Sequence, residues 1–161
     1  MQTVTIKKQN AFKAYQAADA AGKKMLETLL GAESVKPTDI RELINNWSDI
    51  LRLTGADPDD YFLRPGETDD ELANRQSKLI AKAYNQGEEL DPANPKQPKY
   101  YPWHEVVKDD SKPSGFGLSY DGFAYWNSFS TVGVRHCFVR ADDAIDAGKK
   151  FIEIYERQKI R

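Results

Sequence analysis

The twelve residues EELDPANPKQPK, at positions 88–99, separate two kinds of sequence. Three prolines fall within seven residues of this stretch. Proline fixes φ and lacks an amide donor, so the stretch predicts an extended connection. Apolar residues recur with helical spacing before it, and short β-prone runs follow it. The sequence therefore predicts an α+β fold with N-terminal helices, a small antiparallel sheet of three to four strands, and a C-terminal helix packed on that sheet.

The helical part is expected over residues 10–87. Asn10 is the predicted N-cap of a first helix over 11–30, which stops at Gly31. One apolar stripe runs along this helix, and Gly22 lies on it. Because glycine in a helix interior costs ~1 kcal/mol relative to alanine, Gly22 is the expected point of any interruption.

Two more helices are expected before the proline-rich connection. One covers 38–53, between a proline that opens it and a glycine that ends it. The other covers 68–86. There Thr68 and Glu71 form a T-x-x-E capping box, and Gly87 is the stop.

The sheet and the final helix are expected over residues 100–158. Three β-prone stretches, YYPWHEVV, GFGLSYDGFAYW and TVGVRHCFV, are separated by Gly, Pro, Asp and Ser. A last helix starts at Asp142 or Asp143 and runs close to the end of the chain. At this length, the helical part, the connection at 88–99 and the sheet predict a single domain, 1–161.

The tetrapeptide Ala-Gly-Lys-Lys occurs twice, at 21–24 and at 147–150. A P-loop needs a second glycine upstream and a hydroxyl after the lysine. Ala17 and Asp143 occupy the upstream positions, and a second lysine replaces the hydroxyl, so the motif does not predict phosphate binding. In each copy the glycine lies on an apolar stripe, where it allows another element to approach closely. Both copies therefore predict helix packing.

Charge and composition restrict the classes of partner. The 161-residue chain has 23 basic and 25 acidic side chains. This balance gives no global reason to expect nucleic acid or an anionic membrane. The single cysteine, Cys137, excludes an intramolecular disulfide. The first 30 residues lack the apolar core of a signal peptide, and no apolar run approaches the ~18 residues that span a bilayer. We expect a soluble intracellular protein with no membrane partner.

The residues that most often carry chemistry do not form a recognisable site. His136 and Cys137 are adjacent, so on a strand they point to opposite faces and cannot bind one metal ion together. Cys137 stands in an apolar stretch, which predicts a core thiol. His104 stands beside Glu105, but adjacency along the chain creates no hydrogen bond. The sequence assigns no catalytic residue, metal or cofactor.

Aromatic residues are concentrated in one segment. Nine of the 18 fall in the 30 positions from Tyr100 to Phe129. One explanation is a core of unusually bulky residues. The other is a recognition surface, because exposed Tyr and Trp often anchor protein partners.

For the second explanation, Trp126 is the expected anchor. Tyr125 and Trp126 are adjacent, so only one of them enters a one-sided core. Trp126 also stands near a predicted strand end, where a loop can present it. The candidate partner-binding residues are Tyr101, Trp103, Tyr120, Tyr125, Trp126 and Arg135.

Exposed rings also stack on single-stranded nucleic acid, which needs a basic track beside them. Residues 100–140 contain four basic and four acidic side chains. Nucleic acid is therefore an alternative partner that the charges do not favour.

Several stretches carry a resemblance to a known family. They are YYPW at 100–103, GFGLS at 115–119, VGVRHCF at 132–138 and GKKFIEIY at 148–155. In these stretches the chain resembles small phage-related proteins of unknown function from bacteriophages and prophages of gut anaerobic bacteria. Their pattern reads Tyr-Tyr-Pro-Trp-Phe, Gly-Phe-x-Phe-Ser, Val-Gly-Ser-Arg-Leu-Cys-Phe and Tyr-x-Gly-Lys-Gln-Phe, before a final Ile-Tyr. SKLIAKAYNQG and AADAAGKKMLETLLG extend the similarity over most of the chain.

The departures from this pattern are His104 for Phe, Val134 for Ser, His136 for Leu and Lys150 for Gln. Two of them place histidine at apolar positions, which argues against a shared catalytic histidine. The resemblance implies a setting, the bacterial cytoplasm or a virion, and no activity.

Three hypotheses about function follow. The first is a non-enzymatic phage or prophage accessory protein that binds a host or phage protein through an aromatic-rich surface. The second is a nucleic-acid-associated phage protein. The third is an enzyme with an unrecognised nucleotide site.

Overall fold

The computed structural model of the chain describes residues 5–6, 8–35, 39–126 and 133–160. The chain divides into two compact units, Met1–Leu43 and Ile44–Arg161, which we call the N-terminal and C-terminal units. Both ends of the proline-rich connection at 88–99 lie in the C-terminal unit. The connection therefore joins two parts of one unit.

The N-terminal unit has two helices where one was expected over 11–30. Its elements are α1 (Lys8–Ala17), α2 (Ala20–Leu30) and α3 (Ala32–Val35). The Asp19 carboxylate accepts a hydrogen bond from the Gly22 amide at 2.8 Å and caps α2. The interruption therefore lies at Asp19 and not at Gly22. The expected cap, Asn10, lies inside α1.

The helix expected over 38–53 begins later than predicted. Here the chain forms the 3-10 turn η1 (Ile40–Glu42) and then α4 (Trp47–Thr54). The Asn46 side chain accepts the Asp49 amide at 3.3 Å, which makes Asn46 the N-cap. Gly55, with φ of 64°, ends the helix as expected. Position 38 lies outside the described residues.

The helix expected over 68–86 is confirmed as α5. After the 3-10 turn η2 (Pro58–Tyr61), α5 covers Asp69–Asn85. The Thr68 amide donates to Glu71 Oε2 at 2.9 Å, so the predicted capping pair forms. Gln86 and Gly87 end the helix with φ of 51° and 84°.

The sheet is a two-stranded antiparallel hairpin in the described residues. Its strands are β1 (Lys99–Lys108) and β2 (Phe116–Trp126). The register shifts between the pairs Trp103–Gly122 and His104–Tyr120, which leaves Asp121 unpaired as a β-bulge. The expected three to four strands are not confirmed.

The third β-prone stretch, 131–139, explains this difference. Its residues 131 and 132 lie outside the described part of the chain. The 3-10 turn η3 covers Val134–His136, and Phe138 then forms one antiparallel bridge with Tyr100. β propensity alone assigned these residues to a strand. That propensity depends strongly on tertiary context, and in the folded chain the residues form a turn instead.

The final helix is also divided in two. α6 covers Ala141–Lys150 and α7 covers Ile152–Ile160. Phe151 lies between them with φ of −116°, and its side chain is only 5% exposed. The break at Phe151 lets both helices pack while this ring enters the core.

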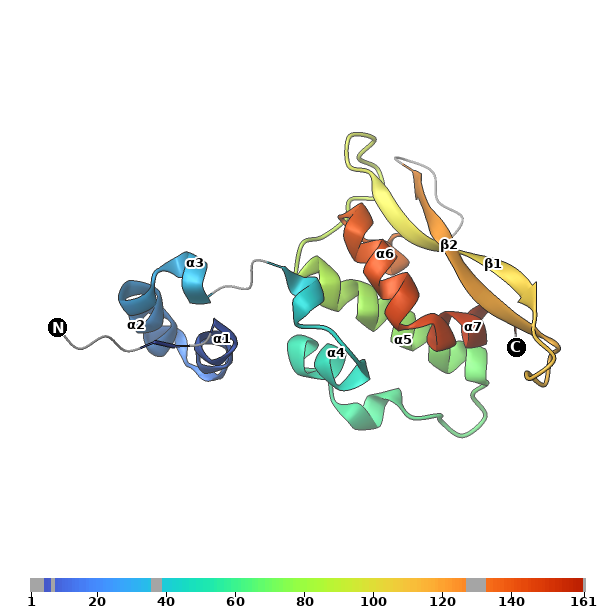
Figure 1. Cartoon of the computed structure of the whole chain (residues 1–161), viewed down its shortest axis with the longest axis horizontal. Helices are drawn as coiled ribbons and strands as arrows, with labels where there is room; N and C mark the ends of the chain where they lie inside the picture. Colours follow the sequence, from blue (N-terminus) through green and yellow to red (C-terminus); the bar gives the residue numbers. More distant parts are fainter. Residues whose placement is uncertain (1–4, 7, 36–38, 127–132, 161) are drawn as a thin grey trace. The chain divides into compact units, whose positions relative to one another are not determined.

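The C-terminal unit is layered. α6 contacts both strands of the hairpin, and α7 contacts β2 on one side and α5 on the other (Figure 1). α4 packs on α5. Large side chains fill the space between these layers, including Ile50, Ile80, Tyr84, Phe138 and Tyr155. Burying side chains of this size contributes roughly 1.5–3 kcal/mol each.

Gly148 occupies the tightest contact between α6 and the hairpin. A Cβ atom at this position would lie 2.7 Å from Pro102 Cβ and 2.9 Å from Tyr120 Cε2. These distances are shorter than van der Waals contact, so only glycine fits. The packing role predicted for this Ala-Gly-Lys-Lys copy is confirmed.

The first copy differs. No residue of α2 is buried, and Met25 and Leu29 on its apolar stripe are 59% and 69% exposed. A Cβ atom on Gly22 would meet only Ala18 and Asp19 of its own chain segment. The shared packing role is therefore confirmed for Gly148 alone.

Gly148→Ala should destabilise the protein by ~1–3 kcal/mol, because the added methyl group must displace Pro102 or the Tyr120 ring. Lys149→Ala is the matched control, since Lys149 is exposed beside it. Urea denaturation measures both variants. Equal losses for the two would contradict the close-packing role of Gly148.

The single-domain prediction is tested by a fragment of residues 44–161. This fragment keeps the core of the C-terminal unit, so we expect it to fold alone, with a thermal transition close to that of the full chain. A fragment without a cooperative transition would show that the two units fold as one domain. Calorimetry of the fragment and the full chain measures this.

Candidate functional site

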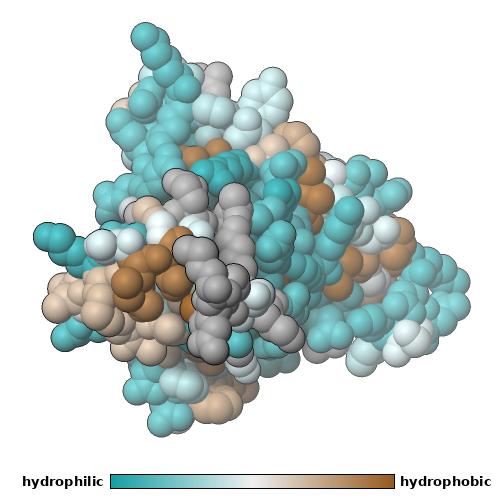
Figure 2. All heavy atoms as spheres, turned by 60° about the vertical axis from the view of Figure 1, so that its left-hand side comes forward, coloured by the Kyte–Doolittle hydropathy of each residue, from teal (hydrophilic) through white to brown (hydrophobic). Residues whose placement is uncertain are grey.

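Half of the exposed large hydrophobic side chains in the described residues lie on the hairpin. They are Trp103, Val106, Phe116, Phe123 and Tyr125. Figure 2 shows another face of the chain, which is largely hydrophilic with separate hydrophobic areas. The hairpin is therefore the part of the C-terminal unit that offers the most apolar contact surface.

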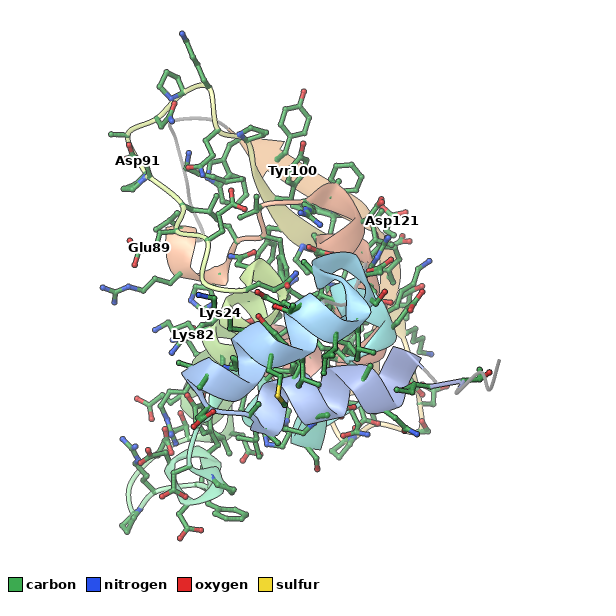
Figure 3. All side chains as sticks on the ribbon, turned by 90° about the vertical axis from the view of Figure 1, so that its left-hand side faces the viewer. Lys24, Lys82, Glu89, Asp91, Tyr100 and Asp121 are labelled. Carbon is green, nitrogen blue, oxygen red and sulfur yellow. The ribbon has the colours of Figure 1, made fainter. Side chains whose placement is uncertain are left out.

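Three rings form a cluster at the open end of the hairpin, which we call the hairpin aromatic cluster: Tyr100, Phe123 and Tyr125. Tyr100 pairs directly with Tyr125 across the strands. Phe123 lies two residues before Tyr125 and shares its face. The Tyr100 ring lies 5.5 Å from the Phe123 ring and 6.1 Å from the Tyr125 ring, between centroids. Figure 3 shows Tyr100 among neighbouring rings.

The cluster is open to solvent. Tyr125 is 65% exposed and Phe123 is 40% exposed, while Tyr100 is half-buried. Ring pairs at these separations contribute ~0.5–1.5 kcal/mol beyond area burial. The rings therefore support one another's orientation without being covered.

The expected anchor, Trp126, is placed differently from the prediction. Its residue is half-buried, and Nε1 is fully enclosed with no hydrogen-bond partner in the part of the chain that the structure describes. Tyr125 is the exposed member of the adjacent pair. The alternation rule holds, but the choice of Trp126 as the exposed residue is wrong.

Two other candidate tyrosines, Tyr101 and Tyr120, pack against residues of the core. Tyr101 is 6% exposed, and its ring packs edge-on against Tyr155 at 6.1 Å. Burial raises the pKa of Tyr101. Tyr120 is half-buried, with its ring against Gly148 and, at 5.9 Å, the His104 ring. Tyr101 in particular has too little free surface to contact a partner.

The remaining candidates are exposed. Trp103 is 55% exposed and pairs with Gly122, whose missing side chain leaves open space. Arg135 is exposed in η3 and lines a cavity beside α5. The prediction missed Tyr100 and Phe123. The spacing of Phe123 and Tyr125 by two residues was the signal for a shared face.

Acidic side chains also lie on the hairpin. Glu105 and the bulged residue Asp121 are exposed, and neither forms an ion pair within the described residues. Figure 3 shows Asp121 at the outer side of the hairpin. Asp121, two residues before Phe123, therefore places a carboxylate near the rings, while Glu105 lies further along β1, opposite Ser119.

The His104 side chain is buried and contacts both α6 and α7. Its Nε2 lies 3.0 Å from the Gly148 carbonyl oxygen, and its Nδ1 lies 3.1 Å from Lys159 Nζ. A neutral ring with its proton on Nε2 satisfies both contacts. Burial and the Lys159 charge lower the pKa of His104, although the bond to Gly148 opposes them.

Lys159 lies over two of the core rings. Its ammonium is 5.0 Å from the Tyr101 centroid and 5.7 Å from the Tyr155 centroid. The residue as a whole is exposed, yet burial of its ammonium group against these rings lowers the pKa of Lys159 to about 8. The group links α7 to β1 through His104.

His136 and Cys137 also belong to the core. His136 Nδ1 lies 3.0 Å from the hydroxyl of Ser77, which is 1% exposed. Burial, and secondarily the Lys78 charge, lower the pKa of His136 to about 4. Cys137 is fully buried, donates to the Gly133 carbonyl at 3.2 Å, and has its pKa raised to about 12 by burial. The prediction of a core thiol is confirmed.

No group of three or more His, Cys, Asp or Glu side chains is arranged to hold a metal ion within the described ranges. None of the helices described here is long and apolar enough to span a bilayer. Comparisons with protein-family models, curated proteins and solved structures found no match.

The free energy of unfolding should fall as the pH drops from about 6.5 to about 5. Both imidazoles have lowered pKa values in the folded chain. The unfolded chain, with histidine near its ordinary value of ~6.5, therefore binds more protons in this range. The slope should reach up to ~1.4 kcal/mol per pH unit for each histidine. Urea denaturation at several pH values measures it.

NMR titration of the imidazole resonances provides the check. The pKa values of both rings should lie below 6.5 in the folded protein, with that of His136 at about 4. Imidazoles that titrate at the ordinary value would contradict the burial-based explanation.

Proposed function

We propose that this chain is a non-enzymatic protein-binding module of the phage or prophage accessory kind, and that it binds its partner through the hairpin aromatic cluster. The observation that supports this most is the exposure of Phe123 and Tyr125 on a regular strand. Large aromatic side chains left exposed side by side are typical of interaction sites.

The hairpin supplies a pre-organised scaffold for these rings. β1 and β2 pair over nearly their whole length, and α6 and α7 support the hairpin. The rings also contact one another. Less conformational entropy is then lost on binding, because the contact residues are already ordered.

The surrounding charge favours a particular partner chemistry. Asp121 would attract a protein surface that combines an apolar pocket with Arg or Lys side chains. The same carboxylate would repel a phosphate backbone, which needs basic side chains. The charge therefore favours protein over nucleic acid at this site.

Tyr125→Ala should abolish recovery of the partner from phage-infected or lysogenic bacterial cells. Truncating an aromatic hot spot commonly costs ~2 kcal/mol or more, which weakens binding about thirtyfold. The melting temperature should change little, because Tyr125 is 65% exposed. Quantitative pull-down with the tagged full chain measures recovery.

Phe62→Ala is the matched control, since Phe62 is 64% exposed in another part of the C-terminal unit. It should retain the same partner. Equal recovery by both variants, or equal loss, would show that the cluster does not select the partner.

A further inference from the structure

A cavity of about 540 Å³ lies beside the second half of α5. Lys78, Lys82 and Asn85 line it from one face of α5, at spacings of four and three residues. The loop 87–90 forms a second wall, and Val134 and Arg135 of η3 form a third. This volume lies within the ~300–1,000 Å³ of small-molecule sites.

Three cations and two carboxylates, those of Glu88 and Glu89, line the cavity, which gives it a small excess of positive charge. No ion pair joins Lys78, Lys82 or Arg135 to a carboxylate in the described part of the chain. Like charges four residues apart on a helix repel each other, although Lys82, in the last turn of α5, also interacts favourably with the helix dipole. The C-terminal unit as a whole has 16 basic and 20 acidic side chains, so this local excess of cations opposes the trend of the unit.

The cavity also offers groups of other kinds. Glu88 and Glu89 supply carboxylates, which accept hydrogen bonds from hydroxyl groups, and Leu90 and Val134 supply apolar surface. Figure 3 shows Lys82 and Glu89 on the same side of the C-terminal unit. The lining thus combines cations for an anionic group, acceptors for hydroxyl groups and a small apolar wall.

The walls are held at a fixed separation by Asn85. Its Nδ2 donates to the Cys137 carbonyl at 2.9 Å, and its Oδ1 accepts from the Val139 amide at 3.0 Å. These two bonds tie the segment after η3 to the end of α5. Because both halves of the amide are used, the two walls formed by α5 and η3 are pre-organised rather than brought together on binding.

We propose that this cavity binds a phosphorylated small molecule of nucleotide size, with the phosphate held by Lys78, Lys82 and Arg135 and sugar hydroxyl groups by Glu88 and Glu89. Arginine and lysine are the usual partners of phosphate oxygens. This site is separate from the hairpin aromatic cluster and does not depend on the proposed protein-binding function.

His136 provides an internal reporter of binding. It follows Arg135 in the chain, and the positive charge of Lys78 acts on its ring. A phosphate bound at Lys78 would offset this charge, so the pKa of His136 should rise. His104 is the only other histidine, and it lies at the α6–β1 contact instead.

The test is an NMR titration of the imidazole resonances in the full-length protein, with AMP, inorganic phosphate and adenosine in separate arms. We expect AMP to cause a saturable shift of His136 and no shift of His104. AMP should bind at least about tenfold more tightly than phosphate or adenosine alone, because it engages both the cations and the carboxylates.

Charge-removing variants locate the site. Lys82→Ala and Arg135→Ala should each weaken AMP binding about tenfold or more, while Lys108→Ala, an exposed lysine on the hairpin, should not. Amide spectra verify that each variant folds. Tyr125→Ala should bind AMP normally, which separates this proposal from the one for the hairpin.

Three results would overturn the proposal. One is the absence of a saturable His136 shift at millimolar AMP. Another is equal affinity for AMP and inorganic phosphate, which would show that the cavity recognises phosphate alone and not a ligand of nucleotide size. The third is equal weakening by Lys82→Ala and Lys108→Ala, which would indicate non-specific attraction.

Discussion

The close approach of α6 to the hairpin at Gly148 is the contact on which the C-terminal unit depends. Pro102 and Tyr120 occupy the space that a side chain on Gly148 would need. With the helix backbone this near, the Gly148 carbonyl comes within hydrogen-bonding distance of His104. One missing side chain thus determines both the packing distance and the position of a buried polar group.

The polar side chains around this contact, His104 and Lys159, are held in place by the helices and rings that pack around them. His104 joins the α6 backbone to Lys159 on α7, and the Lys159 ammonium lies over two tyrosine rings. Burial disfavours charge on these groups, so the imidazole stays neutral. An arrangement that contains His, Lys and Tyr side chains therefore serves as a cross-link between helices and sheet.

This framework leaves two surfaces for interaction in the C-terminal unit. The hairpin leaves Tyr125 and Phe123 exposed near the Asp121 carboxylate, which has no ion-pair partner among the described residues. The cavity beside α5 gathers cations. The hairpin surface is an open cluster of rings near a carboxylate, whereas the cavity is a partly open recess with an excess of cations. Proteins and small phosphorylated molecules are the partner classes that suit these two chemistries.

Local sequence signals determined the α+β class, α5 with its capping pair Thr68 and Glu71, and the hairpin with its alternating rings. These features depend on residues within a few positions of one another. Tertiary structure alone decided that Tyr125 rather than Trp126 faces solvent and that the stretch before Phe138 turns instead of extending. It also decided that Arg135 lines the same cavity as the lysines of α5. Each of these outcomes depends on contacts between segments far apart in the chain, and residue spacing carries no information about which segment will lie opposite.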